Sequence, residues 1–229
     1  MSEDNLDENT LDKVISVSKA VLGDLGVPSI IVEIFGNLIP NQRLDRITKF
    51  IRELEKRISD LEIIITDIDK QTEYIHLLEN GMLHAYRASS DKRLEYIASI
   101  ISNGLTEEKI EVNRYIYLLN ILDELNDEEI IWLRFYLHPT IGGDEEFRDK
   151  HQETLRLARA YIGAEQEELD KSALQDSYKE HLERLGLIKT KINIDRNTKM
   201  PIYDSFGNPK GYKYISHLGK MLLREIGLI

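Results

Sequence analysis

A heptad repeat over residues 44–68 is the feature that most constrains what this chain can fold into. Its apolar side chains recur in alternating steps of three and four, which places one continuous stripe on one side of a helix. The a and d positions are Leu44, Ile47, Ile51, Leu54, Ile58, Leu61, Ile65 and Ile68. Because a 3.5-residue repeat favours a left-handed supercoil with a partner helix, the pattern predicts helix–helix association.

The stripe has two interpretations. Isoleucine at a with leucine at d, as at Ile51 and Leu54, favours a parallel two-stranded coil and predicts that the eight positions form a homo-oligomer interface. Phe50 and Ile64 occupy g positions and widen the stripe, as in a helix that packs against several neighbours within its own bundle. The sequence leaves both arrangements open.

Composition limits the class of protein. The chain has 229 residues, 41% of them hydrophobic, and no cysteine. This length suits one large domain or two small ones, and neither disulfides nor thiolate metal ligands can form. The acidic start, MSEDNLDENT, lacks the basic and apolar regions of a signal peptide. We therefore expect a cytoplasmic protein, with which the absence of cysteine is compatible.

Glycine, proline and helix-capping residues divide the chain into three parts. Residues 1–10 predict a disordered acidic tail, and residues 11–165 a helical body. The body contains one heptad helix over 41–80, which Gly81 would either cap or kink. Residues 170–229 show a helix, short extended runs separated by turn formers, and a final helix, which is typical of a winged-helix-like module. The predicted fold is mainly α, with a helical-bundle or coiled-coil body and a small C-terminal α+β module.

Charge is distributed unevenly along the chain. Residues 1–170 hold 19 Lys or Arg and 35 Asp or Glu, a net charge of −16, whereas residues 171–229 hold 11 and 6, a net charge of +5. An acidic body is repelled by nucleic acid, whereas a basic module can be drawn to it. The candidate contact residues line the predicted hairpin: Lys189, Lys191, Arg196, Lys199, Lys210 and Lys213.

The helix that precedes the hairpin argues against sequence-specific DNA reading. It carries Asp176, Glu180 and Glu183, where a recognition helix would offer Arg, Asn or Gln to the base edges. We therefore expect the module to dock an unidentified protein partner, and we expect any nucleic-acid binding to be weak and non-specific.

No residue pattern predicts catalysis, a metal or a cofactor. The six histidines show neither an HExxH motif nor 2-His-1-carboxylate spacing. Acidic pairs such as Glu107-Glu108 fall in the first turns of predicted helices, where the helix dipole accounts for them. Gly142-Gly143 lacks the Lys-Ser/Thr pair and the strand–turn–helix context of a phosphate-binding loop. We expect a protein without enzymatic activity.

The most apolar stretch, residues 21–40, is short for a membrane span. Pro28 and Pro40 leave eleven residues between them, about half of the ~20 that a spanning helix needs. Glu33 interrupts the stretch, and a carboxylate is costly in hydrocarbon. We expect a buried core helix and no stable membrane insertion.

Four segments occur in an order that resembles a known family. They are IPNQRLDRITKFIRELEKRI, KRLEYIASIISNGL, LDELNDEEIIWLRFY and the C-terminal HLERLGLI with YKYISHLGKMLL. This order is similar to uncharacterised helical proteins of bacteria and prophages, and to the abortive-infection alpha family, over about residues 35–229. The resemblance implies a bacterial cytoplasmic protein with a phage-defence role, and it supplies no catalytic residues.

The leading hypothesis is a non-enzymatic regulatory or phage-defence-associated protein. It would self-associate through helices and dock a partner through its C-terminal module. One alternative is a DNA-binding transcriptional regulator that uses the basic module. Another is a membrane-active abortive-infection effector that uses residues 21–40.

Overall fold

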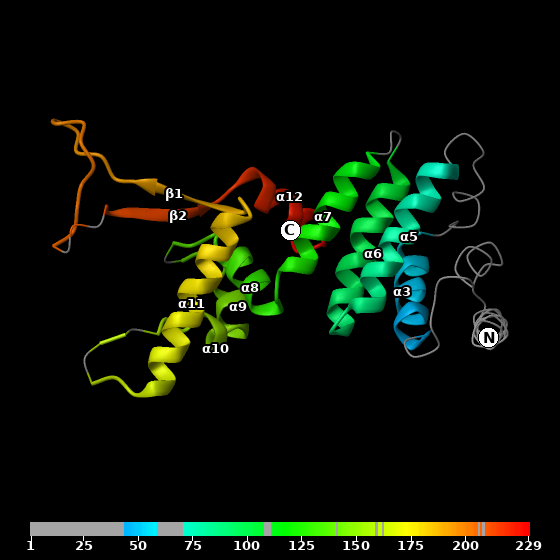
Figure 1. The fold of residues 1–229 in the computed structure, drawn as a ribbon, viewed down its shortest axis with the longest axis horizontal. Coiled ribbons are helices and arrows are strands. Elements are labelled where there is room, and N and C mark those ends of the chain that lie inside the picture. The colour runs from blue at the N-terminus through cyan, green and yellow to red at the C-terminus, as the bar shows by residue number, and fades with distance from the viewer. Residues whose placement is uncertain are drawn as a thin grey trace, which may run out of the picture. The chain divides into compact units, whose positions relative to one another are not determined.

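The computed structural model describes residues 44–58, 71–107, 111–140, 142–158, 160–161, 163–205, 207 and 209–229. These residues are mostly helical, with a small two-stranded antiparallel sheet near the C-terminus (Figure 1), which is the predicted fold class. They form two compact units. The first holds the described residues up to 123 together with 225–227, and the second holds residues 124–224 together with 228–229.

The first unit is a set of packed helices. They are α3 (Leu44–Arg57), α5 (Gln71–Arg87), α6 (Asp91–Thr106) and α7 (Val112–Glu124). Helix α3 packs against both α5 and α6. Ser90 begins α6 as its N-cap, because its hydroxyl accepts a hydrogen bond from the Arg93 N–H at 3.2 Å and so satisfies a donor of the first turn.

The heptad stripe is used inside this unit as far as the structure describes it. The fully described positions are all buried: Ile47, Ile51, Leu54 and Ile58. Leu44 belongs to α3, but its side chain, like the residues Leu61, Ile65 and Ile68, lies outside the description. Because α3 packs on α5 and α6 of the same chain, the bundle interpretation accounts for the buried positions. A homo-oligomer interface through all eight remains a prediction.

The helix boundaries differ from the expected single helix over 41–80. Helix α3 ends at Arg57, and α5 continues through Gly81 to Arg87. A Cβ atom at Gly81 would lie only 2.6 Å from Cγ1 of Ile101 on α6. Glycine at this position therefore lets the backbone of α5 approach α6 closely, and it does not end the helix.

The second unit combines helices with the small sheet. Its elements are α8 (Asp127–Phe135), α9 (Glu145–Lys150), α10 (Gln152–Leu155), α11 (Gln166–Arg184), β1 (Ile188–Ile192), β2 (Gly211–Ile215) and α12 (His217–Glu225). The buried apolar residues come from the helices and the base of the sheet, and they include Trp132, Leu133, Leu182, Leu187, Ile188, Ile215 and Leu222.

The boundary between the two units falls between residues 123 and 124, earlier in the sequence than the boundary expected near residues 165–170. Helix α8 packs against α11, and Glu129 on α8 lies 2.6 Å from Nδ1 of His181 on α11. Glu129 also closes the capping box of α8, because its carboxylate accepts the Asn126 N–H while the Asn126 side chain accepts the Glu129 N–H. These contacts place α8 with the C-terminal elements.

Candidate partner-docking site

Strands β1 and β2 form a β-hairpin of the second unit, and β1 follows directly after α11. Gly186 has a φ of +73°, a left-handed conformation that glycine adopts without strain, and it turns the chain from α11 into β1. Ser216 fixes the other end of the hairpin, since its hydroxyl donates to the Gly186 carbonyl at 2.6 Å and accepts the Gly219 N–H at 3.0 Å. The base of the hairpin is therefore fastened to the helices on both sides.

The register of the two strands sorts their side chains onto two faces. Lys189 pairs with Tyr214, and Lys191 pairs with Tyr212. Directly paired residues and residues two apart lie on the same face of a sheet, so these four side chains share one face. All four are exposed. Lys210 directly precedes β2, and its carbonyl accepts the Asn193 N–H from the residue after β1. The ladder therefore continues by one residue, and Lys210, two residues before Tyr212, extends this face. We call Lys189, Lys191, Lys210, Tyr212 and Tyr214 the lysine–tyrosine face.

The opposite face of the hairpin packs against its own unit. Ile188 and Ile215 are paired and buried at the base. Farther along, the Lys213 ammonium donates to the Glu183 carboxylate on α11, and the Thr190 N–H donates to the same carboxylate at 3.1 Å. These bonds hold the pKa of Glu183 below its ordinary value, the bond from Lys213 being the larger cause. This face is covered at its base and engaged by Glu183 at Thr190 and Lys213, whereas Ile192 farther out is exposed. The lysine–tyrosine face is exposed along its whole described length.

The distal part of the hairpin, between β1 and β2, is linked by further backbone hydrogen bonds. The Asn193 N–H donates to the Lys210 carbonyl, the Ile202 N–H to the Asn193 carbonyl and the Lys210 N–H to the Ile202 carbonyl, at 2.8, 2.9 and 2.7 Å. Asp195 holds the first distal turn, because its carboxylate accepts the N–H groups of Asn197 and Thr198. The described residues between the strands are thus held together by backbone hydrogen bonds and by the Asp195 carboxylate.

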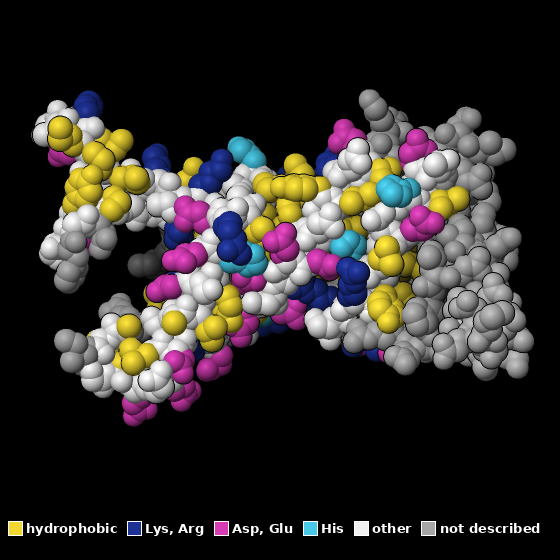
Figure 2. Space-filling view, in the orientation of Figure 1, with side chains coloured by type: hydrophobic (Ala, Val, Ile, Leu, Met, Phe, Trp, Pro, Cys, Tyr) yellow, Lys and Arg dark blue, Asp and Glu magenta, His cyan; other side chains and the backbone are white. Residues whose placement is uncertain are grey.

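Large apolar side chains gather on the outer part of the hairpin, as Figure 2 shows. The exposed ones are Ile192, Ile194, Met200, Ile202, Tyr203, Tyr212 and Tyr214. Exposed apolar groups that are gathered in this way, and rimmed by charges, mark interaction surfaces more often than scattered single ones do.

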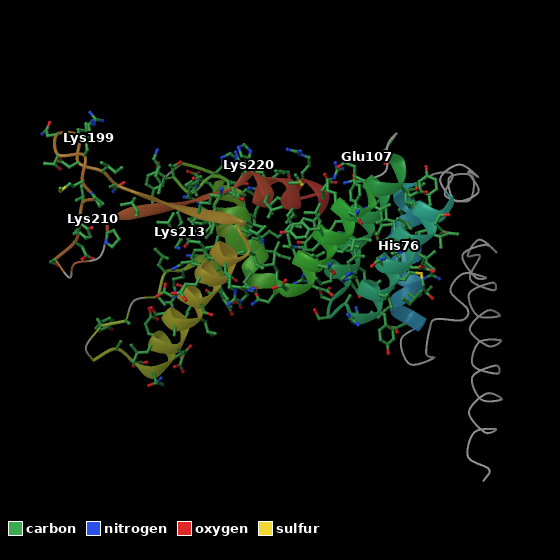
Figure 3. The ribbon with its side chains drawn as sticks, turned by 45° about the horizontal axis from the view of Figure 1, so that its top comes forward. His76, Glu107, Lys199, Lys210, Lys213 and Lys220 are labelled. Atoms are coloured by element: carbon green, nitrogen blue, oxygen red, sulfur yellow. The ribbon has the colours of Figure 1, made fainter. Side chains whose placement is uncertain are left out.

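The six predicted contact cations all lie on this hairpin. Lys189 and Lys191 are on β1, and Arg196 is in the first distal turn. Figure 3 labels the other three: Lys199 in the same turn, Lys210 immediately before β2 and Lys213 on β2. Lys213 pairs with Glu183. Within the described residues the other five cations have no carboxylate partner. Residues 186–216 hold six Lys or Arg and two Asp, a net charge of +4.

A second surface feature of the unit has the opposite charge. An open groove of about 600 Å³ lies beside α11, and its charged lining consists of one cation, Lys171, and four acidic residues: Glu128, Glu153, Glu167 and Asp170. Carboxylates repel phosphates and other anions, so this groove is no part of a site for a polyanion. The hairpin and the groove give the unit one basic surface and one acidic surface.

Neither a metal-binding cluster nor a membrane span is found in the described residues. They contain no group of three His, Asp or Glu side chains placed to hold a metal ion. None of the helices in this part of the chain combines the length and the apolar character that a bilayer crossing requires; residues 21–40 lie outside it. Comparison of the chain with protein-family models, with curated proteins and with solved structures gives no match.

Proposed function

We propose that this chain is a non-enzymatic interaction protein whose C-terminal unit docks an anionic macromolecule through the β-hairpin. The lysine–tyrosine face carries the proposal, because it combines exposed aromatic rings with lysines that have no carboxylate partner in the described structure. Aromatic residues supply contact area at interfaces, while cations steer an anionic partner toward it. The apolar stripe of α3 is buried against helices of its own chain. The proposal therefore does not depend on self-association through α3 and concerns only the docking of a partner.

The biological setting of this docking is proposed from the family resemblance. A helical body joined to a basic docking module suits a regulatory or phage-defence-associated protein of bacteria. In such a protein the hairpin would recognise a partner or a trigger, and the body would carry the response. The acidic remainder of the chain would repel anions that approach elsewhere, which favours the hairpin as the point of contact.

Retention of the full chain on immobilised heparin, used as a general polyanion, tests the proposal. A variant with Lys189→Gln, Lys191→Gln and Lys210→Gln should elute at clearly lower salt than the wild type, because each lost cation removes a counterion-releasing contact. A matched control loses three exposed cations elsewhere, through Arg52→Gln, Arg87→Gln and Lys150→Gln.

The control variant should elute with the wild type although its net charge changes by the same amount. Equal shifts for the two triple variants would mean that total charge governs retention, and the hairpin would lose its assigned role. Circular dichroism spectra of all three proteins establish that they are equally folded.

A further inference from the structure

We propose that the docked macromolecule is a single-stranded nucleic acid, whose bases stack on Tyr212 and Tyr214 while Lys189, Lys191 and Lys210 contact its phosphates. This inference rests on the proposed docking function and names the class of its partner. It follows from the arrangement of aromatic and basic side chains on one face of the hairpin.

The two tyrosines form an aromatic platform. They are two residues apart on β2 and therefore on the same face, and their ring centroids are 6.3 Å apart with planes inclined by 53°. Tyr212 is 52% exposed and Tyr214 is 39% exposed, so a large part of each side chain is open to solvent. Proteins that bind single strands without sequence preference use such rings on a sheet surface, because every base has a face that can stack.

The lysines flank this platform at the spacing of the strand pairs. Lys189 lies directly across from Tyr214, and Lys191 lies directly across from Tyr212, with about 5 Å between paired Cβ atoms. A base on either ring would thus bring its phosphate close to an ammonium group. The one lysine on the packed face, Lys213, is held by Glu183 and takes no part.

The neighbouring helix favours a single strand over a duplex. A winged-helix protein that reads duplex DNA places the helix before its wing in the major groove. Helix α11 occupies that position in the chain, and it holds six Asp or Glu against three Lys or Arg. Insertion of this helix between two phosphate backbones would be repulsive, whereas a single strand can lie on the hairpin without approaching α11.

Fluorescence anisotropy with the full chain tests the inference. The probes are a labelled oligothymidylate and oligouridylate of about 12 nucleotides, within the site sizes of single-strand binders, a mixed-sequence duplex of equal length, and a polyglutamate peptide of similar charge. We expect both single strands to bind more tightly than the duplex and the peptide. Comparison of the two single strands distinguishes DNA from RNA as the source of the shared chemistry.

Substitutions of the tyrosines separate stacking from charge. Tyr212→Ala and Tyr214→Ala should each weaken single-strand binding about 5-fold or more, whereas the two Phe variants, which keep a ring, should remain within about 2-fold. A control with Tyr117→Ala and Tyr161→Ala removes two exposed tyrosines that lie outside the hairpin, and it should leave affinity unchanged.

Each contrary result has its own meaning. Tight binding of polyglutamate without binding of oligonucleotides would overturn the nucleic-acid inference and leave the docking function in place, with an acidic protein as partner. Tighter binding of the duplex, or equal affinities of the Ala and Phe variants, would overturn single-strand stacking. If no probe binds even at low salt, both the inference and the docking function fail.

Discussion

The Lys213 ammonium on β2 donates a hydrogen bond to the Glu183 carboxylate on α11. This contact ties one face of the hairpin to its own unit and neutralises one of the six cations expected to meet a partner. The exposed lysines of the opposite face, Lys189 and Lys191, remain without a carboxylate partner in the described structure. The contact between Lys213 and Glu183 thus leaves the unpaired lysines on the opposite face of the hairpin.

The Glu183 contact predicts a specific dependence of stability on pH. Because the pKa of Glu183 is lowered from 4.5 in the folded state, chiefly by Lys213, its contribution is fully present above that value and is lost as pH falls through the lower folded pKa. The Glu183 side chain is 36% exposed, so we expect only about 0.2–1 kcal/mol. Urea unfolding should find Glu183→Gln less stable than the wild type at about pH 7, with the difference shrinking as the pH falls below 4.5. A constant difference would contradict this account.

Gly219 predicts a steric limit at the base of the hairpin. An added Cβ would lie 2.3 Å from the Leu187 carbonyl oxygen and 2.9 Å from Cγ1 of Ile215. Although alanine favours a helix over glycine, this overlap should make Gly219→Ala destabilising by roughly 1–3 kcal/mol. Lys220→Ala, at the next and exposed position of α12, is the control and should change the melting temperature little. A Gly219→Ala protein as stable as the wild type would show that the backbone can move apart here.

An aspartate in the buried stripe of α3 should destabilise the fold. Leu54 is fully buried, and an unpaired carboxylate at this position should cost more than about 3 kcal/mol. Leu54→Asp should therefore lose helical structure, whereas Arg52→Asp at an exposed position of the same helix should not. Circular dichroism and sedimentation velocity measure both properties. A wild-type dimer that Leu54→Asp converts into a folded monomer would instead favour the coiled-coil interpretation.

The capping box of α8 predicts a moderate loss of stability. The Asn126 side chain accepts the Glu129 N–H at 2.8 Å, which satisfies one donor of the first helical turn. Asn126→Ala should destabilise the second unit by about 1 kcal/mol, while Asn126→Ser, which can still accept this bond, should lose less. Thermal unfolding of the two variants provides the measurement. Equal losses would indicate that packing, and not the cap, sets the effect.

Local signals in the sequence predicted the features that depend on neighbouring residues. Ser90 and Asn126 cap α6 and α8, and such caps are local because they need only a short side chain and the N–H groups two or three residues onward. Gly186 turns the chain into β1 in the left-handed conformation. The mainly helical fold with a small sheet was predicted from the same periodicities.

Tertiary contacts decided what the sequence could not. Gly81 was expected near the end of a helix, but it lies within α5 because Ile101 of α6 packs against it. The tyrosines of the hairpin were missed as candidate contacts, although Tyr212 and Tyr214 alternate as Lys189 and Lys191 do. That they share a face with these lysines follows only from the register of β1 and β2. The sequence does not give this register, because a long connection separates the two strands.

Amide hydrogen exchange of the full chain, with and without saturating heparin oligosaccharide, tests most directly whether the hairpin is the docking surface. Docking on the lysine–tyrosine face should slow exchange in peptides from residues 188–215 and leave those from α3, α5 and α6 unchanged. Slowed exchange that appears in these three helices and spares the hairpin would contradict the account.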